Sequence, residues 1–166
     1  AMTLPESASS GFSQVLVCID QQTRWVEAFP IKTADAVTLS KVLVEIVARH
    51  GIPQSVRCDR AKAWLSILFQ QLCKKMKIKT KITSSYLPRS DGQVERANQM
   101  ILDGLRARLS LEEDWMLSLP YVLMSIRGAV SGTTGFSLFE LSHGRHMTLP
   151  SNTGLEQEPD KSRWPL

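Results

Sequence analysis

Residues 86–98 carry the strongest pattern in the chain and read Tyr-Leu-Pro-Arg-Ser-Asp-Gly-Gln-Val-Glu-Arg-Ala-Asn. Proline, serine and glycine in the first half indicate a loop, and the second half begins an amphipathic helix. The helix carries Glu95 near its start, and 35 residues separate it from Asp59. An acidic residue directly after such a loop suits a metal-dependent phosphoryl-transfer site.

The same residues resemble the catalytic core of retroviral and Ty3/Gypsy-type retroelement integrases, where the pattern reads roughly Tyr-x-Pro-Gln-Ser-x-Gly-x-Val-Glu-Arg-x-Asn. Residues 20–30 are similar to the family segment Asp-x-x-[Ser/Thr]-x-Trp-x-Glu-Ala-Phe-Pro. Gly-Ile-Pro at 51–53 and Thr-Gly-Phe-Ser-Leu-Phe-Glu-Leu at 134–141 resemble two further family signatures. The resemblance covers most of the chain, from residue 4 to residue 150.

The resemblance implies a fold, a reaction and a site. The fold would be α/β and ribonuclease H-like, with a mixed sheet of about five strands flanked by helices. The reaction would be metal-dependent DNA strand transfer, for which integrases use two aspartates and one glutamate. By motif, Asp59 matches the second aspartate and Glu95 the glutamate, so both are the expected catalytic residues and metal ligands. Oxygen ligands suit Mg²⁺ or Mn²⁺.

The first catalytic aspartate of the family is expected to precede residue 1. In the family it lies in a Trp-x-x-Asp-Phe-x-Gly-Pro-Leu-Pro context, and Leu4-Pro5 matches the end of that segment. Asp20 instead matches a noncatalytic turn, so we predict a turn or capping role for it. The missing segment is the central strand of the family's sheet, which predicts a partly opened sheet or its completion by another segment or subunit.

Two departures from the family pattern bear on catalysis. Around Asp59 the family shows [Ser/Thr]-Asp-[Asn/Gln]-Gly-x-x-Phe, and this chain has Cys-Asp-Arg-Ala-Lys-Ala-Trp at 58–64. Losing the glycine removes conformational freedom beside the site, and Arg60 is placed to pair with Asp59 and compete with a metal ion. Arg89 replaces the family's glutamine. Such changes fit a domesticated, retrotransposon-derived copy.

Composition is that of an ordinary globular domain. The chain has 166 residues, 43% of them apolar, with no membrane-spanning run and no signal peptide. Cys18, Cys58 and Cys73 show no metal-ligand spacing, which favours reduced, buried thiols in an intracellular protein, nuclear or cytoplasmic. The net charge of +4 mildly favours a nucleic-acid partner, most simply DNA.

In integrases the region around the catalytic glutamate faces the DNA end, so the resemblance implies DNA contacts at the basic and polar residues near the two carboxylates: Lys62, Arg89, Gln93 and Arg96. A separate lysine run places Lys75, Lys77, Lys79 and Lys81 at alternate positions, as on one strand face. Two interpretations of this run stay open: a surface that contacts phosphates, or a solvated edge strand that lysines protect from pairing.

Hydrophobic patterning predicts a polar leader over 1–12 whose Ala1-Met2 is typical of an expression remnant, a core over 13–150 and a flexible tail over 151–166. Thr33 or Asp35 is the expected cap of the first helix, which Gly51 and Pro53 end. The expected strands are 14–19, 24–31, 55–58 and 77–82. The other expected helices are 63–76, 92–109 and 112–127, the last kinked or broken at Pro120.

Two functions follow from different classes. The first is an integrase-type core for DNA integration, with Mg²⁺ or Mn²⁺ bound. The second is a domesticated, catalytically silent module without a cofactor that binds nucleic acid or protein. The resemblance implies a homodimer for either, and the sequence is compatible with it, since residues 116–126 carry more apolar side chains than one helix stripe buries.

Overall fold

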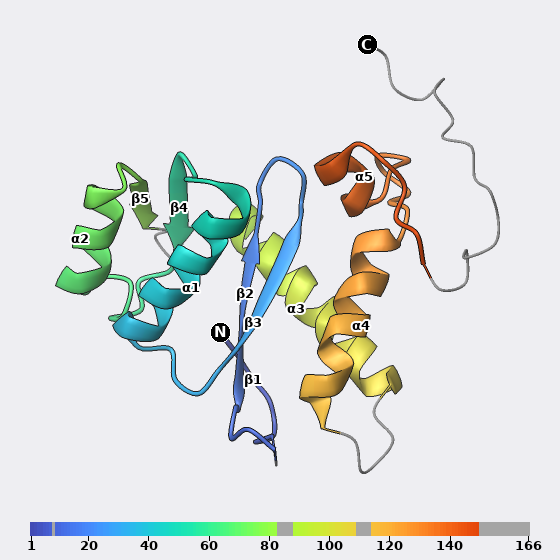
Figure 1. Ribbon diagram of the computed structural model, residues 1–166, viewed down its shortest axis with the longest axis horizontal. Helices are drawn as coiled ribbons and strands as arrows, with labels where there is room; N and C mark the ends of the chain where they lie inside the picture. Colours follow the sequence, from blue (N-terminus) through green and yellow to red (C-terminus); the bar gives the residue numbers. More distant parts are fainter. Residues whose placement is uncertain (8, 83–87, 109–113, 150–166) are drawn as a thin grey trace. The chain divides into compact units, whose positions relative to one another are not determined.

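The computed structural model describes residues 1–7, 9–82, 88–108 and 114–149, with the side chains of 88–91 excepted. Strands and helices alternate along the middle of the chain, after three strands and before three helices (Figure 1). The predicted tail over 151–166 lies outside the described residues. The elements are β1 (Met2–Thr3), β2 (Gln14–Ile19), β3 (Val26–Ile31), α1 (Ala36–His50), β4 (Ser55–Cys58), α2 (Ile67–Lys75), β5 (Lys79–Ile82), α3 (Pro88–Arg108), α4 (Trp115–Gly128) and α5 (Leu138–His143).

The strands pair as two sheets. One has the order β1-β2-β3, with β1 antiparallel to β2 so that Met2 pairs with Val15. The other is the parallel pair β4-β5, in which Ser55 pairs with Lys79. Among the described residues no strand joins the two sheets. Strand β1 has two residues and pairs with β2. This pairing agrees with the prediction of an opened sheet and differs from one continuous five-stranded sheet.

Helix α1 begins and ends where the sequence predicts. The Asp35 carboxylate accepts hydrogen bonds from the backbone N–H groups of Val37 and Thr38, both at 2.9 Å. Gly51 ends the helix with φ of 82°, a conformation that glycine adopts without steric cost. Between these ends, Leu39 and Leu43 are buried on one face. Short-range capping and periodicity are therefore sufficient to define this helix.

Other boundaries differ from the predictions. Helix α2 begins at Ile67 rather than at 63, because residues 61–66 form consecutive turns and Ser66 caps the helix through the Phe69 N–H. Helix α3 begins four residues early, at Pro88, whose fixed φ suits a first helical turn. Helix α4 continues through Pro120, so of the expected kink or break the break is wrong. Strand β1 and helix α5 were not predicted.

The described residues fall into two compact units. The first combines residues 1–17 with 28–98, and its buried core includes Val15, Leu39 and Phe69. The second combines residues 18–27 with the described residues from 99 onward, and its core includes Ile101 and Leu105. Asp59 and Glu95 both belong to the first unit.

Gly104 of α3 permits close packing against α4 in the second unit. A Cβ atom there would lie 2.6 Å from Cγ1 of Val122, far inside van der Waals contact. We expect Gly104→Ala to lower the free energy of unfolding by about 1–3 kcal/mol through overpacking, even though alanine is the better helix former. Urea denaturation measures this change.

Gly92 provides the matched control, because it lies in the same helix and its added Cβ would meet nothing within 4 Å. Gly92→Ala should leave stability unchanged or raise it by up to about 1 kcal/mol. Adding Val122→Ala to Gly104→Ala should cost less than the sum of the single changes. Equal stability of the two glycine variants would contradict the packing explanation.

Candidate metal and nucleic-acid site

Asp59 follows directly after β4, at the carboxyl end of the β4–β5 pair. Cys58, the last residue of β4, is buried and anchors the strand end, whereas Asp59 is exposed. The Asp59 Oδ1 atom accepts one hydrogen bond, from the Ala61 N–H at 3.1 Å. This bond orients the carboxylate and leaves its second oxygen available for a ligand.

The expected ion pair between Arg60 and Asp59 does not form within the described part of the chain. Both side chains are exposed, and the Asp59 carboxylate is engaged by the backbone of Ala61 instead. Arg60 therefore leaves the carboxylate open to a cation in this structure.

The thiols near this strand are inert at neutral pH. Burial, followed by the negative charge of Asp59, raises the pKa of Cys58 to about 11. Burial also raises the pKa of Cys73 above its ordinary value. Both cysteines are reduced and buried, as the sequence predicted, while Cys18 is half-buried. Because thiols with raised pKa values stay protonated, Cys58 and Cys73 are structural rather than nucleophilic.

Glu95 lies in α3 and is exposed. Ala97, two positions further, is buried, so the helix packs one face inward and presents Glu95 outward. Asn98 lies three positions after Glu95, on the neighbouring part of the helix surface. The Asn98 Oδ1 atom is buried and has no hydrogen-bond partner among the described residues. A buried amide oxygen of this kind is costly unless a donor or a cation satisfies it.

The oxygen atoms available as metal ligands suit a hard divalent cation. Asp59 and Glu95 offer carboxylate oxygens, and Asn98 offers an amide oxygen that lacks a partner. Magnesium and manganese prefer such oxygen ligands. Within the described residues, no group of three or more histidine, cysteine, aspartate or glutamate side chains is placed to hold a metal ion. The third carboxylate of the family pattern is thus not supplied by these residues.

Asp20 has the turn role that its sequence context predicted. Its Oδ2 atom accepts hydrogen bonds from the N–H of Gln22 at 3.2 Å and from the N–H and hydroxyl of Thr23, both at 2.7 Å. Partial burial opposes ionisation, but the hydrogen bonds from Thr23 and Gln22 outweigh it and lower the pKa of Asp20 below its ordinary value. The carboxylate is thereby committed to the turn between β2 and β3.

The predicted nucleic-acid contacts lie in different settings. Lys62 is exposed in the turns that follow Asp59, Arg96 is exposed beside Glu95, and Gln93 is half-buried. Arg89 belongs to α3, and its side chain lies outside the described set.

The predicted alternation of four lysines on one strand is wrong. Lys75 is the last residue of α2, and Lys77 lies in a turn with φ of 57°. Lys79 and Lys81 alone belong to β5. Lys74 and Lys75 instead form the last turn of α2, where a helix favours cations.

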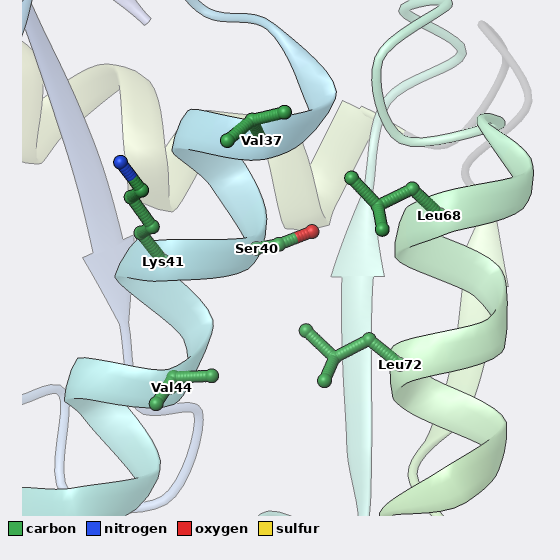
Figure 2. Close-up of a pocket in the computed structure, with 6 residues that line it drawn as sticks. All are labelled: Val37, Ser40, Lys41, Val44, Leu68 and Leu72. Atoms are coloured by element: carbon green, nitrogen blue, oxygen red, sulfur yellow. The ribbon is translucent and has the colours of Figure 1, made fainter.

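A separate groove lies between α1 and α2 in the first unit, and Figure 2 shows side chains of both helices facing it. It encloses about 390 Å³. Lys41 supplies its one charge and Ser40 its one hydroxyl, and the other lining residues are Val37, Val44, Leu68 and Leu72. Without a carboxylate, this groove is unsuited to metal-dependent chemistry.

No helix in the described residues is both long enough and apolar enough to cross a lipid bilayer.

Known proteins similar to this chain are retroviral polyproteins and integrases. Residues 2–88 match the family described as integrase core domain. The Gag-Pol polyprotein of koala retrovirus is 39% identical over 138 residues, which are 81% of this chain and 8% of that protein. The Gag-Pol polyprotein of avian reticuloendotheliosis virus is 33% identical over 140 residues, 83% of this chain and 12% of that protein. The chain thus spans a small part of the length of these relatives.

Solved structures show the fold. The HTLV-2 integrase catalytic core domain in complex with magnesium, in its trimeric form, has a TM-score of 0.71 at 19% identity, over 86% of this chain and 93% of that one. The simian T-cell lymphotropic virus intasome in complex with the PP2A regulatory subunit B56 gamma gives 0.72 at 21% identity, over 90% and 54%. The predicted α/β, ribonuclease H-like fold is confirmed.

Proposed function

Because this chain belongs to the integrase core domain family, we propose that it is a metal-dependent core for DNA strand transfer, of retroelement origin. The observation that carries the proposal is the setting of two carboxylates in one compact unit. Asp59 follows β4 and has one oxygen without a hydrogen bond from the described residues, and Glu95 lies on the exposed side of α3. Both residue types match the chemistry that phosphoryl transfer requires.

Asp59 and Glu95 would hold the metal ions, with the Asn98 amide oxygen as a further candidate ligand. Bound Mg²⁺ or Mn²⁺ supplies the activation of a water or DNA 3′ hydroxyl nucleophile and stabilises the leaving oxygen. Lys62 and Arg96 are exposed cations on the two elements that carry the carboxylates, where they would neutralise DNA phosphates. Gln93 would donate a hydrogen bond to the same strand, and Arg89 would add charge at the start of α3.

Self-association is part of the proposal. The HTLV-2 integrase core is described with magnesium in both dimeric and trimeric forms. On α4 of this chain, Leu117 and Tyr121 are exposed at 72% and 51%, and the Arg108 guanidinium lies 4.8 Å from the Tyr121 ring centre. These residues form an outward stripe that suits a homodimer contact. The reduced cysteines favour an intracellular setting, nuclear or cytoplasmic.

A second function is a catalytically silent module that binds nucleic acid or protein. Its supporting observation is that the described residues assemble no group of three acidic, histidine or cysteine ligands. The Arg-Ala pair after Asp59, in place of the family's Asn/Gln-Gly, also favours it. The two functions differ in one measurable property, which is metal binding at Asp59 and Glu95.

Calorimetric titration of Mn²⁺ tests the first function. We expect the protein to bind Mn²⁺, and Asp59→Asn and Glu95→Gln each to weaken the affinity at least about tenfold, or about 1.4 kcal/mol. Glu45→Gln is the matched control, because Glu45 is exposed on α1 and pairs with Arg49. Equal Mn²⁺ affinity in all four proteins would contradict the metal assignment. No Mn²⁺ binding by the unmodified protein would favour the silent module.

A further inference from the structure

The β4–β5 pair brings cations from two separate segments onto one face. Arg57 of β4 pairs directly with Lys81 of β5, and Ser55 pairs with Lys79. Directly paired residues of parallel strands point to the same side of the sheet, and residues two apart share that side. Arg57, Lys79 and Lys81 therefore project from one face, which we call the basic face, and all three are exposed.

The opposite face is the one that packs inward. Val56 and Thr80 on it are half-buried, and Cys58 is buried. The Thr80 hydroxyl donates a 3.1 Å hydrogen bond to the Gln70 side chain of α2. Helix α2 thus covers this side, and the basic face is the side that points away from α2.

The basic face has no internal neutralisation among the described side chains. No ion pair there joins Arg57, Lys79 or Lys81 to a carboxylate. Like charges directly opposite each other weaken strand pairing. If the lysines only protected an edge strand from pairing, cations on β5 alone would be enough. That role does not explain why Arg57 of β4 lies opposite Lys81. A polyanion lying over the face would relieve this repulsion.

We propose that the basic face binds the phosphate backbone of duplex DNA without the help of a metal ion. Lys79 and Lys81 stand about 6.6 Å apart along their strand, so each flexible head group can reach a separate phosphate on a duplex with one charge per about 1.7 Å of axis. Asp59 follows β4 directly, so DNA held here lies beside the proposed metal site. The inference rests on the proposed DNA function and adds a binding surface to it.

The experiment measures fluorescence anisotropy of a labelled 30-base-pair duplex in EDTA, over a range of sodium chloride concentrations. We expect Arg57→Gln/Lys79→Gln/Lys81→Gln to weaken binding about 10- to 100-fold at 0.1 M salt and to reduce the slope of log affinity against log salt by about 2–3. The charge-retaining variant Arg57→Lys/Lys79→Arg/Lys81→Arg should bind as the unmodified protein does.

The matched control is Lys74→Gln/Lys75→Gln/Lys77→Gln, which removes the same charge from exposed lysines off the basic face. We expect it to change affinity by less than about threefold. Equal losses in the two triple variants would overturn the proposal, as would absence of duplex binding by the unmodified protein in EDTA. Thermal melting checks folding, and the single Lys81→Gln change, with a loss of about three- to tenfold, serves if the triple variant unfolds.

The outcomes separate this inference from the proposed function. Normal Mn²⁺ binding with no specific loss in the basic-face variant would overturn the inference and leave the metal-dependent function standing. Specific loss in that variant without any Mn²⁺ binding would support the basic face and favour the silent module.

Discussion

The Arg127→Met variant is expected to lose about 3–5 kcal/mol of the free energy of unfolding, because it leaves a buried carboxylate without its cation. Arg127 lies in α4 and reaches the first two residues of β3, Val26 and Glu27, within the second unit. Its guanidinium lies 3.0 Å from Glu27 Oε2, and the two side chains are 19% and 11% exposed. Removing one partner of an ion pair that is this deeply buried is costly, because the other charge stays buried.

Arg127 also contacts a backbone carbonyl and an aromatic ring, in addition to the Glu27 carboxylate. Its Nε and one terminal nitrogen donate to the Val26 carbonyl oxygen at 3.0 and 2.7 Å. The guanidinium also lies 4.3 Å from the Trp25 ring centre, and the Trp25 Nε1–H donates to Glu27 Oε1 at 3.0 Å. Methionine fills similar volume but provides none of these donors, so the Val26 carbonyl and Glu27 both lose partners.

Urea denaturation of three variants tests this account. Arg106→Met is the matched control, since Arg106 pairs with Asp103 at 70% and 59% exposure and should contribute less than about 1 kcal/mol. The double variant Arg127→Met/Glu27→Met should recover part of the loss, because it removes the unpaired charge. If Arg127→Met costs no more than Arg106→Met, the buried pair has no special weight.

Replacing Phe69 by alanine should cost about 3–5 kcal/mol in the first unit. Phe69 is fully buried in α2, and its ring meets Trp64 edge-on with centroids 4.9 Å apart. Trp64 belongs to the turns between Asp59 and α2, and its carbonyl accepts a 2.8 Å hydrogen bond from the Gln70 side chain. The variant therefore loses core volume and the support of the segment that follows Asp59.

Ile67→Ala is the control, because Ile67 lies in the same helix but is 75% exposed. We expect a change within about 0.5 kcal/mol for it. Urea denaturation followed by circular dichroism gives both values. In the Mn²⁺ titration, Phe69→Ala should also weaken binding while Ile67→Ala does not, because only Phe69 supports the turns beside Asp59. Similar stabilities for the two variants would contradict the central position of Phe69 in the core.

Much of the local structure was predictable from the sequence. The strands at 14–19 and 55–58, the capping of α1 by Asp35 and its end at Gly51 all match the structure. The turn role of Asp20 also matches. These features depend on residues within a few positions of one another, so pattern and capping chemistry are enough. Helix α2 was placed too early because the turns at 61–66 contain residues that helices also accept.

By itself the sequence determined the family-typical motifs, the two candidate carboxylates and the periodic elements around them, because each is written in short local runs. Tertiary structure alone decided which distant side chains meet. Register in the β4–β5 pair sets Arg57 opposite Lys81, and packing in the second unit joins Glu27 to Arg127 across 100 positions. Such contacts depend on strand pairing and core packing between segments far apart in the chain, which no local pattern specifies.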